Sequence, residues 1–321
     1  MESTAMRGLP DLAGRSLSAG SPSPLAERQN AKDLIHLLKA IIIAHRRARR
    51  YDATYLSVSI LVALSGLVAT FVKGLAVPVS VIGGLWAAAC AAGVVAWTRR
   101  EIQRAATIQE MFDVRLFRLS WNSIAAGDPI DTAQVNWLAK RYRGDRSALR
   151  DYYDVPRLPA PYDVVACQML NLAWGARVRR RYARVLLTGV LAWSVAGVAV
   201  GAAAGLTVIE TALWWYVPSL GVALLAWDAL RAQREVAAER ERLLGILWER
   251  VRASVTGSGV DLPATVRAVQ DAIFQTRQRD IRVPTWFFSR FEAADRADFR
   301  AIMAELTSTV SVRTAGDRAN A

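Results

Sequence analysis

Four long apolar runs interrupt a chain of 321 residues, and they form two close pairs. A single charged residue separates the members of each pair, Lys73 in the first and Glu210 in the second. A helix needs about 20 apolar residues, with roughly 17–25 tolerated, to cross the hydrocarbon core of a bilayer. The sequence therefore predicts four transmembrane helices in two hairpins, at residues 55–72 and 74–98 and at residues 185–209 and 211–227.

Arginines border these runs on one side only. They stand before the first run, after the second, before the third and after the fourth: Arg46, Arg47, Arg49, Arg50, Arg99, Arg100, Arg104, Arg177, Arg179, Arg180, Arg181, Arg184, Arg231 and Arg234. Positively charged flanks stay in the cytoplasm when a membrane protein inserts. Both termini and the long middle segment are therefore predicted to be cytoplasmic.

The rest of the pattern predicts an all-α membrane protein with a mainly helical cytoplasmic domain, because no segment alternates with period two. Within that domain, helix is expected to resume near Tyr162, and two further helices are predicted over residues 263–279 and 289–307. The predicted divisions are a disordered tail at 1–25, a cytoplasmic helix at 26–54, a transmembrane hairpin at 55–98, a cytoplasmic segment at 99–184, a second hairpin at 185–227, C-terminal cytoplasmic helices at 228–310 and a disordered tail at 311–321.

In a soluble protein, a net charge of +13 would indicate binding to nucleic acid. Here much of the basic excess flanks the apolar runs, where attraction to anionic lipid accounts for it at about 1 kcal/mol per residue. We expect the lipid bilayer as a partner and no nucleic-acid polymer, while a small anionic ligand remains compatible. The two cysteines, Cys90 and Cys167, predict no disulfide framework.

Small residues recur every four positions in two of the apolar runs. Such spacing lets helix backbones approach closely in lipid, either within the four-helix unit or between subunits. The centres of the runs carry no ionisable residue, which argues against a proton relay or an ion-coupled transporter. The candidate helix-packing residues are Gly197, Gly201, Gly205, Gly84, Ala88 and Ala92.

Motifs for catalysis are missing from the sequence: it has no phosphate-binding loop, no HExxH motif and no paired-cysteine metal site. The two histidines, His36 and His45, have no acid–base partner nearby in sequence. Capping, turns and arginine pairing are the expected roles of the carboxylates Glu110, Asp113, Asp128 and Asp131. We expect no enzyme, no metal and no cofactor.

Six short motifs stand in a fixed order around the apolar runs. They are Glu27-Arg28-Gln29-Asn30, Ile108-Gln109-Glu110-Met111-Phe112-Asp113, Leu119-Ser120-Trp121-Asn122, Cys167-Gln168-Met169-Leu170-Asn171-Leu172-Ala173-Trp174, Val269-Gln270-Asp271-Ala272-Ile273-Phe274 with Arg277, and Val283-Pro284-Thr285-Trp286-Phe287-Phe288. By these motifs the chain resembles the SMODS-associating four-transmembrane effector family from about residue 25 to about residue 306. It departs from the family pattern at Met169, Gly175, Thr285 and the pair Tyr152-Tyr153.

The resemblance implies a pore-forming effector of cyclic-oligonucleotide antiphage signalling (CBASS), located as a multi-pass protein in the bacterial inner membrane. A companion CD-NTase nucleotidyltransferase would make a cyclic oligonucleotide, and the effector, as a homo-oligomer, would bind it and permeabilise the membrane to cause abortive infection. Such a ligand needs cations or amides for its phosphates and aromatic faces for its bases. The candidate contacts are Trp121, Asn122, Gln168, Asn171, Trp174, Arg177, Arg277, Trp286 and Arg290.

Two alternatives remain open from the sequence. One is a constitutive small channel or transporter, which would need no nucleotide. The other is a non-conducting membrane scaffold that recruits a partner through its cytoplasmic helices.

Overall fold

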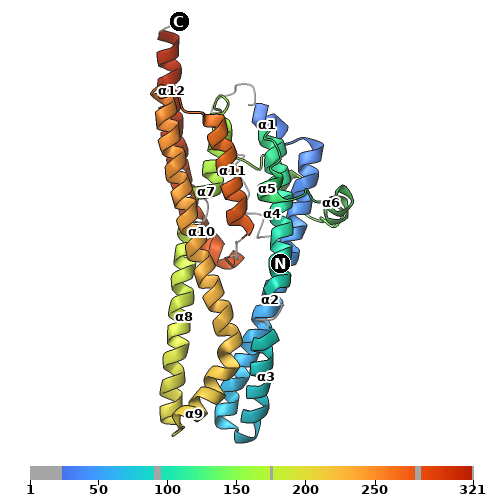
Figure 1. The fold of residues 1–321 in the computed structure, drawn as a ribbon, viewed down its shortest axis with the longest axis vertical. Coiled ribbons are helices and arrows are strands. Elements are labelled where there is room, and N and C mark those ends of the chain that lie inside the picture. The colour runs from blue at the N-terminus through green and yellow to red at the C-terminus, as the bar shows by residue number, and fades with distance from the viewer. Residues whose placement is uncertain (1–23, 90–94, 174–175, 279–282, 320–321) are drawn as a thin grey trace. The chain divides into compact units, whose positions relative to one another are not determined.

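The computed structural model describes residues 24–89, 95–173, 176–278 and 283–319, and these residues form helices with no strand, as the sequence predicted (Figure 1). Contacts divide the chain into two units. The core unit comprises Met1–His45, Gln103–Arg179 and Val236–Ala321, and the hairpin unit comprises Arg46–Ile102 and Arg180–Glu235. Each is described separately.

Helices account for most of the described chain. In order they are α1 (Pro24–Arg28), α2 (Lys32–Phe71), η1 (Lys73–Leu75), α3 (Ala76–Ala89), α4 (Val95–Phe117), α5 (Ser123–Ala126), α6 (Thr132–Ala139), η3 (Ser147–Leu149), α7 (Tyr162–Ala173), α8 (Ala176–Ala203), α9 (Val208–Thr211), the π-helical segment η4 (Ala212–Tyr216), α10 (Val217–Val255), α11 (Leu262–Gln278) and α12 (Thr285–Ala319). Four of them, α2, α4, α8 and α10, have residues in both units, so the chain passes from one unit to the other only inside helices.

Several predicted boundaries are corrected at the chain ends. The cytoplasmic helix expected at 26–54 is split, because α1 ends at Arg28 and α2 begins at Lys32. Leu25, assigned to a disordered tail, is 1% exposed in the core. Helix α12 continues to Ala319, where a disordered tail was predicted from residue 311. Helix α7 begins at Tyr162, where helix was expected to resume.

The hairpin unit is held together by close approaches at glycine. A Cβ atom at Gly197 of α8 would lie 2.6 Å from the Trp215 ring, so only glycine admits this indole. A Cβ atom at Gly83 of α3 would likewise lie 2.6 Å from the Pro218 backbone, and the Ser80 hydroxyl donates to Leu213 O at 2.7 Å. Glycine thus brings α3 and α8 against the η4–α10 segment.

The other small residues expected at helix contacts have different surroundings. Gly201 packs against the Thr211 side chain. Gly205 has a φ of +68°, the left-handed region that favours glycine, and it follows the end of α8. Space around Gly84 is open, Ala88 is exposed, and Ala92 lies outside the described residues.

Among the described residues, two stretches are long and apolar enough to cross a membrane: Tyr162–Ala203, which comprises α7, α8 and two residues outside the described chain, and Val208–Val255. Ala76–Ala89 is a shorter apolar helix. Large aliphatic side chains of the hairpin unit point outward rather than into a core. A contiguous apolar surface of this kind is unfavourable in water and favourable in hydrocarbon. The side chains most exposed include Leu61, Val77, Leu85, Val195, Val198, Val208 and Ile209. These features indicate a membrane protein.

The core unit has a conventional buried interior. Helix α7 lies against α11 and α12, and its apolar face joins residues of α2, α4 and α10 in one cluster. Cys167 of α7 is a free, fully buried thiol, whereas Cys90 lies outside the described residues. Polar side chains also enter this interior, and they define the candidate site.

Candidate functional site

Helix α4 carries two carboxylates into the interior of the core unit. Glu110 and Asp113 are three residues apart, which places them on one face of the helix. Their exposed fractions are 1% and 0%. Burying a charge is costly unless it is paired and hydrogen-bonded, so these two groups require partners from neighbouring helices.

Arg277 of α11 is the principal partner. Its Nη1 lies 2.6 Å from Asp113 Oδ2 and 3.8 Å from Glu110 Oε2, and its Nη2 donates to Asn171 Oδ1 at 3.1 Å. Burial lowers the pKa of the guanidinium, but the Asp113 and Glu110 carboxylates outweigh burial and hold the pKa above its ordinary range. Arg277 is therefore a permanent buried cation.

Glu110 has a second set of donors on α11. Gln270 Nε2 donates to its Oε2 at 2.7 Å, and Arg267 Nη2 lies 3.2 Å from its Oε1. Burial nevertheless raises the pKa of Glu110 to about 7, because desolvation outweighs the nearby arginines. Glu110 is thus a carboxyl group that can change its charge near neutral pH.

Tyr153 links the Asp113 carboxylate to α7 and to the segment between α1 and α2. Its hydroxyl donates to Asp113 Oδ1 at 2.7 Å and accepts a hydrogen bond from Asn171 Nδ2 at 2.7 Å. Its backbone N–H donates to Gln29 Oε1 at 2.9 Å. Burial raises the pKa of the phenol well above its ordinary value, so the hydroxyl keeps the proton that it donates.

The network continues from α11 toward α5. Arg267 is paired with Asp271, and Asn122 Nδ2 donates to Asp271 Oδ2 at 2.9 Å. The Asn122 side-chain oxygen accepts from the backbone of Ile124, which caps α5. Trp121 donates from its indole nitrogen to Gly127 O at 2.8 Å.

Gln168 completes the contacts between α7 and α11. It is fully buried, and its Nε2 donates to Val266 O at 2.8 Å and to Gln270 Oε1 at 3.3 Å. The backbone carbonyl oxygen of Asn171 accepts a hydrogen bond from Arg240 Nη1 of α10 at 3.0 Å. Five of the nine predicted ligand contacts therefore form hydrogen bonds to other residues of the same chain: Trp121, Asn122, Gln168, Asn171 and Arg277.

The remaining predicted contacts lie apart from this network. Arg177 of α8 is paired with Asp298 of α12. Trp286 is 69% exposed near the start of α12, and Arg290, one turn further along, is exposed too. Trp174 lies outside the described residues.

Other polar residues have local roles. His36 and His45 hydrogen-bond amide oxygens, those of Asn136 and Gln109. Asp131 caps α6 by accepting from the Ala133 N–H at 3.1 Å. Among the described residues, no group of three or more His, Cys, Asp or Glu side chains is placed to hold a metal ion.

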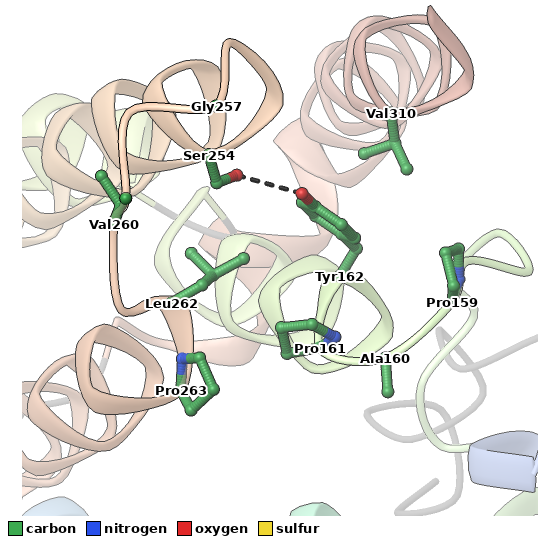
Figure 2. A pocket seen from close by; sticks show the side chains of 11 residues that line it. Pro159, Ala160, Pro161, Tyr162, Ser254, Gly257, Val260, Leu262, Pro263 and Val310 are labelled. Atoms are coloured by element: carbon green, nitrogen blue, oxygen red, sulfur yellow. Dashed lines mark hydrogen bonds between the residues drawn. The ribbon is translucent and has the colours of Figure 1, made fainter. Parts of the chain in front are cut away.

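A cavity of about 520 Å³ lies in the core unit, where the start of α7, the end of α10 and the start of α11 meet (Figure 2). At its wall the Tyr162 and Ser254 hydroxyls lie 3.0 Å apart. The other lining residues are Pro159, Ala160, Pro161, Gly257, Gly259, Val260, Leu262, Pro263 and Val310. None of these lining side chains is charged, so the cavity offers no cation to a phosphate.

Comparison with known proteins identifies the family. A family model described as the SMODS-associating 4TM effector domain matches residues 23–306. The chain belongs to the SMODS-associating 4TM effector family. It is also 24% identical over 279 residues to a probable CBASS effector molecule of Bacillus cereus (strain VD146), covering 82% of this chain and 92% of that protein. No solved structure matches.

Five of the six sequence motifs contribute residues to the buried network, whereas Trp286 of the sixth motif lies apart from it. Motifs that lie far apart in the sequence each supply residues to it: Gln29, Glu110, Asp113, Asn122, Gln168, Asn171, Gln270, Asp271 and Arg277. Sequence reasoning paired the carboxylates with arginines but missed Tyr153, which was noted only as a departure from the family pattern. The position of its hydroxyl depends on long-range packing that no local pattern encodes.

Proposed function

We propose that this chain is a membrane-permeabilising effector of cyclic-oligonucleotide antiphage signalling. An antiphage effector role follows from its family. In the proposal, the core unit binds a cyclic oligonucleotide made by a companion CD-NTase, and the hairpin unit opens the bacterial inner membrane and causes abortive infection. The observation that carries the proposal is family membership joined to a hairpin unit with an outward apolar surface.

Four membrane spans are part of the proposal. The apolar runs and the single charged residues between them suit two hairpins. The arginines at the opposite ends of those runs suit a cytoplasmic core unit with both termini in the cytoplasm. Catalysis plays no part in this mechanism.

Exposed residues are the better ligand contacts in the described state. The side-chain N–H groups of three buried residues already donate hydrogen bonds within the chain: Arg277, Gln168 and Asn171. A ligand would have to break those hydrogen bonds to contact them. Trp286 and Arg290 are exposed at i and i+4 of α12, which places a ring face and a guanidinium on one side of the helix. We propose that these two side chains receive a base and a phosphate.

The buried network is proposed to couple binding to the membrane. Residues of α4 and α10 join it, and both helices continue into the hairpin unit. Shifting a closed-to-open ratio from 99:1 to 1:99 requires about 5.5 kcal/mol of preference for the open state. Several charge-assisted phosphate contacts at about 1.5–3 kcal/mol each can supply that. Homo-oligomerisation would let several hairpin units enclose one pore.

The binding step is tested by melting the purified chain in neutral detergent with a panel of cyclic di- and trinucleotides. Each ring is paired with its linear counterpart, which carries the same bases and phosphates. A ligand that binds only the folded state raises the melting temperature with concentration. One cyclic compound that stabilises the chain while its linear form does not supports the proposal. Equal melting temperatures across a panel that covers both ring sizes and all four bases would favour a channel or scaffold.

A further inference from the structure

The two ends of the hairpin unit differ in charge. At one end the connections near Lys73 and Glu210 join the helices of each hairpin. At the other end, arginines of different helices come together. Arg47 of α2 pairs with Glu101 of α4 at 3.9 Å, and Arg99 of α4 pairs with Asp228 of α10 at 3.8 Å.

The register of α8 against α10 places its arginines at the same end. Trp193 Nε1 donates to Ser219 Oγ at 2.9 Å, Gly197 packs on Trp215, and Gly201 packs on Thr211. The two segments are thus antiparallel: four residues forward along α8 correspond to four residues backward along the segment from α9 to α10. The same register places Arg184 level with Asp228.

Most carboxylates at this end are already paired. Glu101 faces Arg47, Asp228 faces Arg99, and Glu235 accepts from Arg231 at 2.7 Å. Four further arginines are exposed and have no carboxylate partner among the residues that the structure describes. Each belongs to a different helix: Arg50 of α2, Arg100 of α4, Arg184 of α8 and Arg234 of α10. We call these four the arginine ring.

We infer that the arginine ring binds the phosphate headgroups of anionic phospholipids. The inference rests on the membrane-spanning part of the proposed function. A guanidinium forms paired hydrogen bonds with phosphate oxygens. Exposed aliphatic side chains such as Leu61 and Val195 continue along α2 and α8 from the ring, so one lipid can satisfy both surfaces through its headgroup and its acyl chains. A free nucleotide matches only the charge, which is why a lipid fits this surface better.

The test measures headgroup selectivity without nucleotide and without leakage. The purified chain is melted in neutral detergent with added phosphatidylglycerol, cardiolipin or phosphatidylcholine, and bound lipids are counted by native mass spectrometry. Wild type is expected to bind the two anionic lipids and to melt higher with them than with phosphatidylcholine. Each arginine near an anionic headgroup contributes roughly fivefold in affinity, so Arg50→Gln, Arg100→Gln, Arg184→Gln and Arg234→Gln together should weaken anionic lipid binding more than tenfold.

A matched control removes four exposed arginines of the core unit, by Arg115→Gln, Arg143→Gln, Arg146→Gln and Arg250→Gln. It loses the same charge and should bind anionic lipid like wild type. Equal stabilisation of wild type by phosphatidylcholine, or equal loss of lipid in the control, would overturn the inference. So would an equal rise in melting temperature from soluble pyrophosphate. The wild-type selectivity decides the matter even if the fourfold variant fails to fold.

Discussion

Asp113 of α4 and Arg277 of α11 form a buried ion pair, with 2.6 Å between Oδ2 and Nη1. Asp113 is fully buried and Arg277 is 7% exposed, so neither charge can be solvated by water if the other is removed. This pair and the hydrogen bonds around it join α4, α7 and α11 into one network. The stability of the core unit should therefore depend on it.

Arg277→Met should destabilise the core unit by about 3–5 kcal/mol, because it leaves a buried carboxylate without its partner. The melting temperature in detergent measures this loss. Adding Asp113→Asn to the variant should restore part of the stability, since the orphaned charge is then gone. An exposed ion pair provides the control: Arg242→Met, which breaks the pair with Glu239, should leave the melting temperature near that of wild type, because water solvates both charges. Equal losses for the two arginines would contradict the account.

Glu110 should make stability depend on pH. Burial raises its pKa from 4.5 to about 7. Between these values the unfolded chain releases the proton while the folded core unit keeps it. The stabilising contribution is therefore complete below pH 4.5 and is lost as the pH rises through 7.

Melting temperatures of wild type and Glu110→Gln, measured between pH 5 and 8, test this sign. The wild-type melting temperature should fall more steeply with rising pH than that of the variant, because glutamine does not titrate. Glu249→Gln, at an exposed carboxylate of α10, should follow the wild-type profile. Parallel profiles for wild type and Glu110→Gln would show that Glu110 is already ionised at low pH.

Gly197→Ala should destabilise the hairpin unit by about 1–3 kcal/mol, because the added methyl group overlaps the Trp215 ring. Gly84→Ala is the matched control, since open space surrounds Gly84. Its melting temperature should stay near that of wild type. If Gly84→Ala instead changes the subunit number measured by crosslinking, then the α3 face is a subunit interface and the monomeric packing account is incomplete.

Trp286→Ala and Arg290→Gln should each weaken binding of the active cyclic oligonucleotide by roughly 10- to 100-fold, because a stacked base contributes about 1–3 kcal/mol and a phosphate contact about as much. Titration of the ligand against the melting temperature measures the loss. Trp137→Ala is the control: this tryptophan of α6 is also exposed and also lies beside an arginine, Arg141. Unchanged affinity in both α12 variants would move the ligand site elsewhere in the core unit.

Much of the architecture could be read from local patterns. Hydropathy predicted helix pairs on either side of Lys73 and Glu210, where the structure has the short helices η1 and α9. That these pairs cross a bilayer as two hairpins stays a prediction. The start of α11 followed from Pro263, a residue suited to the first turn of a helix. The gap between α1 and α2 was missed because it depends on a tertiary contact, that of Gln29 with the Tyr153 backbone.

The candidate site was harder to predict, for a physical reason. Gln168 and Arg277 have the right chemistry to bind a nucleotide, and the sequence shows no difference between a donor that faces a ligand and one that faces another helix. The packing of α7 on α11 determines which way these donors face, and both side chains point into the buried network. Trp286, in contrast, remains exposed although tryptophan usually adds to a core.

The central claim is that a cyclic oligonucleotide opens the membrane through this chain. Leakage of a trapped dye from liposomes tests it, with the protein oriented so that the core unit faces the added nucleotide. We predict rapid leakage with one cyclic oligonucleotide, none with its linear counterpart, and none from Trp286→Ala at the same concentration. Leakage before any nucleotide is added, or equal leakage with cyclic and linear forms, would contradict the account.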